Sequence, residues 1–371
     1  MSSTSEKSST PKSFLATVVS VQNLVLFGIF WAVSALLFFL LFSIPLPDQE
    51  LPPWYSYGTY IFELGAFLWA SILCWRNWHN PQIVSGRNVW RGLALGMFFY
   101  LIGGMLFGWW ELFWEQEPDV SPADMFYITS YIFLAWGMIL AVVSRRLNLE
   151  WKQWLIVGMI AIGGITFAVW VSITPPTIKA NNIVEPTESV AVAPAPSSAN
   201  NTKAPPIKQQ TGKKPTNTSS TNKSKATPAV TPAAKAEVEK KSVSVPNWVK
   251  DLEVLLSPLK TYVTLFYIVG DVLLLIIATT LLLAFWGGRF SQSWRMIAAA
   301  TFSFYIADMW FKYAAVNIPE YQSGQLLEVF FVFSGVLFGI GAVLEHDLST
   351  RSTRRTTGRR RGGGHQVATD N

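Results

Sequence analysis

"WRGLALGMFFYLIGGMLFGWWE" fills residues 90–111, and no charged residue lies between its opening Arg and its closing Glu. About 20 mostly apolar residues, each rising 1.5 Å, are enough to cross the hydrocarbon core of a bilayer. The stretch therefore predicts a transmembrane helix, with Trp at both ends where indole rings favour the lipid headgroup region. A second stretch with the same Trp-Arg opening, "WRMIAAATFSFYIADMWFKYAA", fills residues 294–315.

The composition of the whole chain agrees with a membrane protein. Of its 371 residues 50% are hydrophobic and only 14% are charged, whereas soluble domains carry roughly 25% charged residues. A single cysteine, Cys74, excludes an internal disulfide and a site with several thiolates. The three histidines lie far apart in the sequence, so we expect no haem, metal or other cofactor between helices.

Eight segments are long and apolar enough to predict transmembrane helices. They are residues 24–46, 56–76, 90–114, 122–143, 152–174, 262–286, 293–316 and 324–345. The sequence thus predicts an all-α, polytopic helical bundle in the membrane.

The short loops predict the orientation of these helices. Loops 46–54 and 115–121 hold acids and no bases, whereas loop 144–151 is basic. Lys and Arg accumulate on the cytoplasmic side, so we expect both termini to be cytoplasmic, in a bacterial inner membrane or a thylakoid membrane. The Arg-rich end of the chain is expected to lie on anionic lipid, and nucleic acid is not an expected partner.

The predicted organisation has five parts. They are a cytoplasmic tail (1–23), a first membrane half with five helices (24–174), a linker (175–250), a second half with three helices (251–346) and a basic cytoplasmic tail (347–371). Pro, Ala, Thr and Lys dominate the linker, which has no aromatic residue between 175 and 241 and is predicted to be disordered. It either tethers the two halves or binds a partner on the non-cytoplasmic side.

The two membrane halves resemble each other. Without a gap, residues 90–111 align with 294–315, so that Trp90 matches Trp294 and Tyr100 matches Phe304. Further matches are Arg91 with Arg295, Ile102 with Ile306, Met105 with Met309, Phe107 with Phe311, and Trp109 with Tyr313. In the following helices Ser121 aligns with Ser323, Tyr131 with Phe333, and Gly137 with Gly339, while upstream Glu63 falls near Asp271. This pattern predicts two parallel repeats of three helices.

Longer stretches carry a family resemblance. "LALGMFFYLIGGMLFGWWELFWEQEPDVSPADMFYITSYIFLAWGM" (93–138), "YIVGDVLLLIIATTLLLAF" (267–285) and "ADMWFKYAAVNIPEYQSGQLLEV" (307–329) resemble the N-terminal membrane sensor region of bacterial diguanylate cyclases, phosphodiesterases and histidine kinases. That family has a Gly-Asp pair where this chain has Gly103-Gly104, and no cyclase, phosphodiesterase or kinase module is expected after the last helix. The resemblance implies a sensing or ligand-responsive module that works through a separate partner.

Charged residues inside the predicted helices are the candidate functional positions. A charge near the bilayer centre costs roughly 2.5–3.5 kcal/mol, so it should face a partner or water. Asp308 and Lys312 lie one helical turn apart and are expected to pair. The pair either fixes helix packing or lines a ligand pocket. Glu63 and Asp271 have no base at helical spacing, so each must find a partner on another helix or in water, or be protonated. They either have a functional role or make simple polar contacts that pack helices.

Glu328, at the start of the last helix, completes a predicted polar pocket formed with Glu63, Asp271, Asp308 and Lys312. Glu111, Glu115 and Asp124 are predicted to form its outer rim. The sequence Ser121-Pro122-Ala123-Asp124 also suits a helix start, with Ser as the cap and Asp in the first turn. For these rim acids, capping and ordinary interface positions are the alternative interpretations.

No catalytic motif stands out, and the chain is not expected to be an enzyme. The leading hypothesis is a receptor-like sensing or signalling module that contacts membrane lipid and a separate cytoplasmic signalling protein. The alternatives are a transporter or channel subunit with an intramembrane carboxylate pathway, and a membrane scaffold or assembly protein.

Overall fold

A computed structural model describes residues 20–44, 51–114, 120–143, 150–173, 245–286, 291–318 and 321–362, with side chains up to Arg351. The first half contains α2 (Val21–Phe42), α3 (Pro53–His79), α4 (Arg87–Trp114), α5 (Ala123–Val143) and α6 (Trp151–Ile173). The second half contains α7 (Asn247–Leu256), the 3-10 turn η1 (Ser257–Leu259), α8 (Lys260–Ala284), α9 (Ser291–Asn317), the 3-10 turn η2 (Leu326–Glu328) and α10 (Val329–Gly362).

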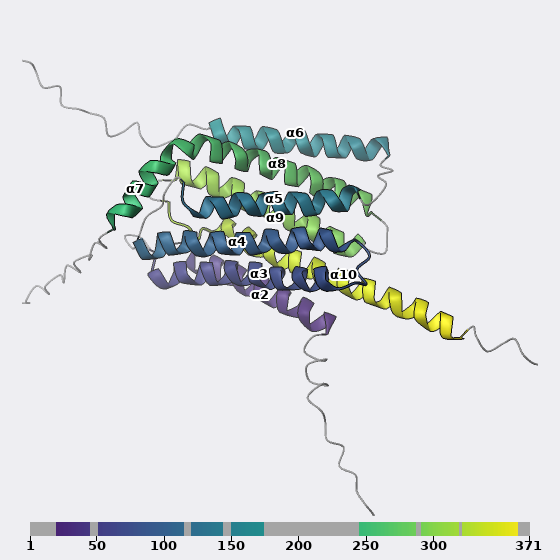
Figure 1. Cartoon of the computed structure of the whole chain (residues 1–371). Coiled ribbons are helices and arrows are strands. Elements are labelled where there is room, and N and C mark those ends of the chain that lie inside the picture. The colour runs from purple at the N-terminus through teal and green to yellow at the C-terminus, as the bar shows by residue number, and fades with distance from the viewer. Residues whose placement is uncertain are drawn as a thin grey trace, which may run out of the picture. The chain divides into compact units, whose positions relative to one another are not determined.

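Each of the eight predicted segments corresponds to a long helix, and the predicted all-α polytopic bundle is confirmed (Figure 1). Within the described residues seven helices are long and apolar enough to cross a membrane, as expected for a multi-pass membrane protein. The 27-residue α9 is not among the seven, because Asp308, Lys312 and several hydroxyl side chains lower its hydropathy. The N-terminal residues 1–19 and the linker residues 174–244 lie outside the described residues.

Two boundaries differ from the sequence-based expectation. Helix α7 begins at Asn247, inside the predicted linker, and packs Val249 between Trp110 and Trp114 of α4. Helix α10 continues to Gly362, well past the predicted end at residue 345. No Pro or Gly interrupts the sequence between residues 342 and 357, so nothing local ends this helix where the apolar run stops.

Six helices form a ring in which each helix packs against the next. Going round, α3 contacts α4, α4 contacts α5, α5 contacts α8, α8 contacts α9, α9 contacts α10, and α10 contacts α3. Helix α2 packs outside against α10 and α3, and α6 packs outside against α8 and α9. The six central helices are therefore the two predicted three-helix repeats, α3–α5 and α8–α10. The repeats contact each other where α5 packs against α8 and where α10 packs against α3.

Residues that match in the repeat alignment face each other across the bundle. Ring centroids are 6.5 Å apart for Trp90 and Trp294, 5.3 Å for Tyr100 and Phe304, and 6.3 Å for Phe107 and Phe311. A residue touches its own counterpart only near an axis that relates the two copies. These successive pairs therefore mark a pseudo-twofold axis between α4 and α9, and they show that the two helices run in parallel.

The beginnings of α4 and α9 repeat the same arrangement. Trp90 and Trp294 are both fully buried. The guanidinium of Arg91 lies 5.3 Å from the ring centre of Trp78, at the end of α3, and that of Arg295 lies 4.6 Å from the ring of Trp286, just after α8. In each repeat, then, an Arg of the second helix makes a cation–π contact with a Trp at the end of the first.

The third helices of the two repeats are α5 and α10. In the structure each residue of α5 corresponds to a residue of α10 two positions later than the sequence alignment predicts. A Cβ on Gly137 would lie 2.9 Å from the Val89 carbonyl oxygen, and one on Gly341 would lie 3.1 Å from the Ser293 carbonyl oxygen. Gly137 and Gly341 therefore correspond, with the same spacing as Trp90 and Trp294, and Gly339 does not correspond to Gly137. Apolar helices match equally well in several registers, so the sequence alone did not distinguish them.

Candidate polar site between the repeats

The predicted pair of Asp308 and Lys312 on α9 is joined by a third charged residue, Asp271. The Lys312 ammonium lies 2.7 Å from Asp271 Oδ2 on α8 and also contacts the Asp308 carboxylate one turn away. The Asp271 side chain is fully buried, while those of Lys312 and Asp308 are 15% and 16% exposed. Lys312 Nζ also lies 5.3 Å from the ring centre of Tyr267. These three charged residues, Asp271, Asp308 and Lys312, are called the charged triad below.

Tyr131 connects the charged triad to the other repeat. It lies on α5, and its hydroxyl is 2.5 Å from Asp271 Oδ1 and 3.3 Å from Asp308 Oδ2. The close approach depends on Gly270, where an added Cβ would lie 2.8 Å from the Tyr131 ring. Two carboxylates thus share one ammonium and one phenol, and the group joins α5, α8 and α9.

Four further acids of the predicted site are described by the structure, and each accepts a hydrogen bond from a tyrosine. The Tyr100 hydroxyl donates to Glu63 at 2.9 Å, and the Tyr267 hydroxyl donates to Asp124 at 2.6 Å. The remaining donors are Tyr60, which bonds to Glu111, and Tyr321, which bonds to Glu328. Three of these four bonds connect different helices, so tyrosines satisfy acids for which the sequence offered no partner.

Glu63 does not join the charged triad. Its partner Tyr100 stacks on Phe67 at 3.9 Å and packs against Phe304 at 5.3 Å. Phe304 in turn contacts Tyr131 with ring centroids 5.5 Å apart. The Phe304 ring therefore lies between Tyr100, the partner of Glu63, and Tyr131, the partner of the charged triad.

Glu328 and Asp124 cap the N-terminal ends of helices. Glu328 accepts the backbone N–H of Gly324 at 2.7 Å and that of Gln325 at 3.1 Å. Asp124 accepts the N–H of Ser121 at 2.7 Å, three residues earlier. The two acids occupy equivalent positions in the two repeats, because their spacing equals that of Trp90 and Trp294. The capping interpretation therefore accounts for both.

The predicted site residues thus have different surroundings. Asp271, Asp308 and Lys312 come together, Glu63 accepts a hydrogen bond from Tyr100, and Glu328 caps the start of the last helix. Glu111 and Asp124 bind tyrosines of neighbouring helices, and Glu115 lies outside the described residues. The tyrosines are the residues that sequence reasoning missed, since a tyrosine in an apolar helix carries no signal of which way it faces.

Acidic side chains outnumber basic ones in this region. Six acids are involved, and in the described part of the chain Lys312 is the only base that donates a hydrogen bond to any of them. The described residues hold no group of three or more His, Cys, Asp or Glu side chains suited to a metal ion. Binding of a proton or of a small cation would therefore change the charge balance directly, in a medium where charges interact strongly.

The comparisons with known proteins do not identify the chain. No protein-family model, curated protein or solved structure matches it. The resemblance to bacterial membrane sensor regions therefore stays a prediction that rests on the quoted motifs.

Proposed function

We propose that this protein is a multi-pass membrane sensing or signalling module that acts through a separate cytoplasmic partner. The observation that carries the proposal is the charged triad, which joins helices of both repeats through one buried set of contacts. A stimulus that adds or removes one charge there changes the attraction between α5, α8 and α9 together. A receptor needs an element that changes between two packings, and we propose that the charged triad is that element.

Helix α10 provides the route from the charged triad to the cytoplasm. It packs along α9, and its 34 residues form one uninterrupted helix, about 50 Å long at 1.5 Å per residue. The hydrocarbon core of a bilayer is only about 30 Å thick, so the helix is long enough to extend well beyond the membrane. Glu328 fixes its starting end through two backbone N–H groups.

A carrier for protons or small cations is the second candidate. It is supported by the 15–16% exposure of Lys312 and Asp308, because an ionisable group on a transport path must be reachable by water. Parallel repeats related by an axis along the membrane normal also occur among transporters. In this function the charged triad would bind and release the transported ion.

The two functions differ in what Asp271→Asn should do. Spin labels are attached to Asn88→Cys, in the first turn of α4, and to Arg351→Cys on α10, in a Cys74→Ala background and in lipid nanodiscs. Both labelled side chains are exposed. If the position of α10 depends on the charged triad, Asp271→Asn should change the distance between the labels by about 1–2 Å, the usual size of a helix shift. Asp251→Asn, which removes an exposed charge on α7, should leave it unchanged.

Flux into liposomes that contain a pH-sensitive dye separates the alternatives. A distance shift without any proton flux supports the signalling function. Flux that is present in the parent protein and lost in Asp271→Asn supports the carrier and contradicts the proposal. If neither the distance nor the flux responds, both functions fail and a scaffold protein remains.

A further inference from the structure

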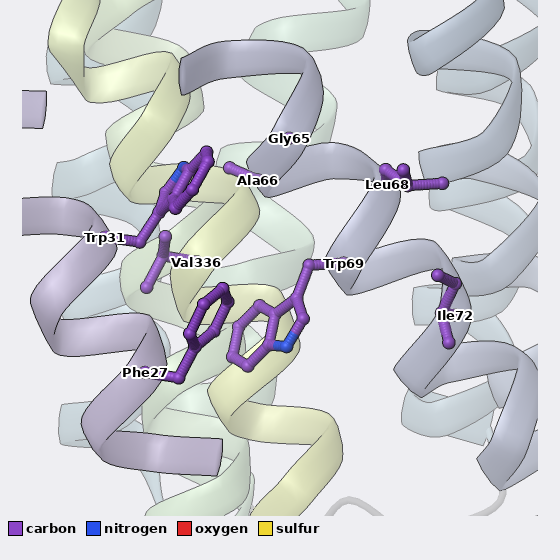
Figure 2. Close-up of a pocket in the computed structure, with 8 residues that line it drawn as sticks. All are labelled: Phe27, Trp31, Gly65, Ala66, Leu68, Trp69, Ile72 and Val336. Atoms are coloured by element: carbon purple, nitrogen blue, oxygen red, sulfur yellow. The ribbon is translucent and has the colours of Figure 1, made fainter. Parts of the chain in front are cut away.

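An apolar groove lies on the side of the bundle formed by α2, α3 and α10. Its volume is about 190 Å³. Phe27 and Trp31 line it from α2, Gly65, Leu68 and Trp69 from α3, and Val336 from α10 (Figure 2). Every side chain around it is apolar or aromatic, so no group in the groove selects a charged or polar ligand.

The two indole rings of the groove are held in place by the packing around them. Trp31 Nε1 donates to the Phe62 carbonyl oxygen at 2.9 Å, and its ring lies where a Cβ on Gly65 would be only 2.5 Å away. A Cβ on Gly28 would lie 2.9 Å from the Trp69 ring, and one on Gly339 would lie 2.2 Å from it. Glycines of three helices thus make room for the rings, and the walls of the groove are formed before any ligand arrives.

The groove opens toward the surroundings of the bundle. Phe27 is 45% exposed, Leu68 48% and Ile72 58%, although all three lie inside helices that are suited to cross a membrane. Since α2, α3 and α10 are all suited to cross a membrane, we take the surroundings of the groove to be lipid hydrocarbon. An engineered apolar cavity of about 150 Å³ binds one benzene molecule, so this groove has room for a segment of about seven carbon atoms.

We infer that this groove binds an acyl chain of a membrane lipid. Lipid tails are as apolar as the groove, so the hydrophobic effect gives no preference for the groove over the rest of the bundle surface. The preference comes from dispersion contacts with rigid walls on several sides. One pair of carbon atoms in contact gains only about 0.1–0.2 kcal/mol, so roughly five to ten added contacts with the walls give a preference of about fivefold over an ordinary lipid-facing surface. The inference does not depend on what the charged triad does.

The bound chain would also support the position of α2. This helix contacts the rest of the bundle mainly through α10, where a Cβ on Gly28 would approach Val336 and Ile340 at 3.3 Å. Between α2 and α3 the groove leaves part of the facing surface uncovered, and an acyl chain placed there contacts both helices.

Photolabelling tests the inference on the full chain. The protein is placed in nanodiscs of phosphatidylethanolamine and phosphatidylglycerol that contain a phospholipid with a diazirine in the middle of its acyl chain. After illumination, labelled peptides are quantified by mass spectrometry. Residues 27–31 and 65–72 should carry about five times more label than residues 159–165 of α6, where Met159, Ile162 and Ile165 are exposed. Equal labelling of these stretches overturns the inference.

Two substitutions close the groove and one serves as a matched control. Leu68→Trp and, separately, Ile72→Trp fill its opening and should reduce groove labelling to the level of α6. Ile61→Trp adds the same indole on the same helix at a position that is 63% exposed and outside the groove, and it should not change the labelling. The inference fails if both closing variants are folded, by their elution and thermal unfolding, and still label like Ile61→Trp.

Discussion

Replacing Lys312 by Met removes the ammonium of the charged triad and keeps a side chain of similar length. Asp271, which is fully buried, then loses its ammonium partner and keeps the hydrogen bond from Tyr131. Removing one partner of a buried ion pair costs about 3–5 kcal/mol, whereas an interhelical hydrogen bond in a membrane protein averages about 0.6 kcal/mol. Because Asp308 and Lys312 are partly exposed, the lower end applies, and Lys312→Met should lower the free energy of unfolding by about 3 kcal/mol.

A double-mutant cycle distinguishes the ion pair from a simple loss of packing. Asp271→Asn removes the acid that Lys312 binds at 2.7 Å. The double variant leaves no unpaired charge at this contact, so it should be less destabilised than the sum of the single variants by about 1–3 kcal/mol. This coupling energy measures the contact between the two side chains, because other consequences of each substitution cancel in the cycle.

The measurement is unfolding in mixed micelles by increasing SDS, followed by fluorescence of the 17 Trp residues. Lys250→Met, at an exposed position on α7, is the control for loss of one positive charge, and it should change stability by less than about 0.5 kcal/mol. A loss below about 1 kcal/mol for Lys312→Met, together with additive single variants, would refute the charged triad as a buried ionic contact.

The same unfolding assay checks two further predictions. Gly92→Ala should cost about 1–3 kcal/mol, because a Cβ at Gly92 would lie 2.5 Å from the Cα of Gly137. Gly163→Ala, where nothing lies within 4 Å, should be neutral or stabilising. Equal effects would contradict the close contact. Glu328→Gln should cost about 1–2 kcal/mol, because both carboxylate oxygens accept backbone N–H groups and an amide would place its own N–H₂ against one of them. Asp251→Asn is the exposed control.

The fold was largely predictable because each long helix is an almost uninterrupted apolar run. Helix α7 is different. Its 10 residues are too few to span a bilayer, and they follow a segment rich in Pro and Lys. Its stability comes from tertiary contacts, with Val249 buried against two Trp residues of α4 and Trp110 donating to Glu253. These contacts depend on where α4 ends, which local sequence does not encode.

The candidate site was predictable only in its charged members. Asp308 and Lys312 stand out because they interrupt an apolar run at the spacing of one helical turn. Asp271 was recognised as an acid without a local partner, and the structure supplies Lys312 and Tyr131 from two other helices. Whether a tyrosine such as Tyr131 turns inward depends on the rotation of α5, which is set by contacts with its neighbours. Glycine at position 270 was the one local sign that a ring packs there.

The position of α9 explains why we place this helix inside the membrane although its sequence is not apolar enough to indicate a span. Between Trp90 and Phe107, α4 lies beside its counterpart α9 over a length of about 25 Å at 1.5 Å per residue, with ring contacts at both ends and in the middle. Helix α4 is apolar enough to cross a bilayer, so we expect α9, whose rings meet those of α4 along that length, to cross it as well. Its charged side chains would be tolerated there because Asp271 of α8 and Tyr131 of α5 bind them.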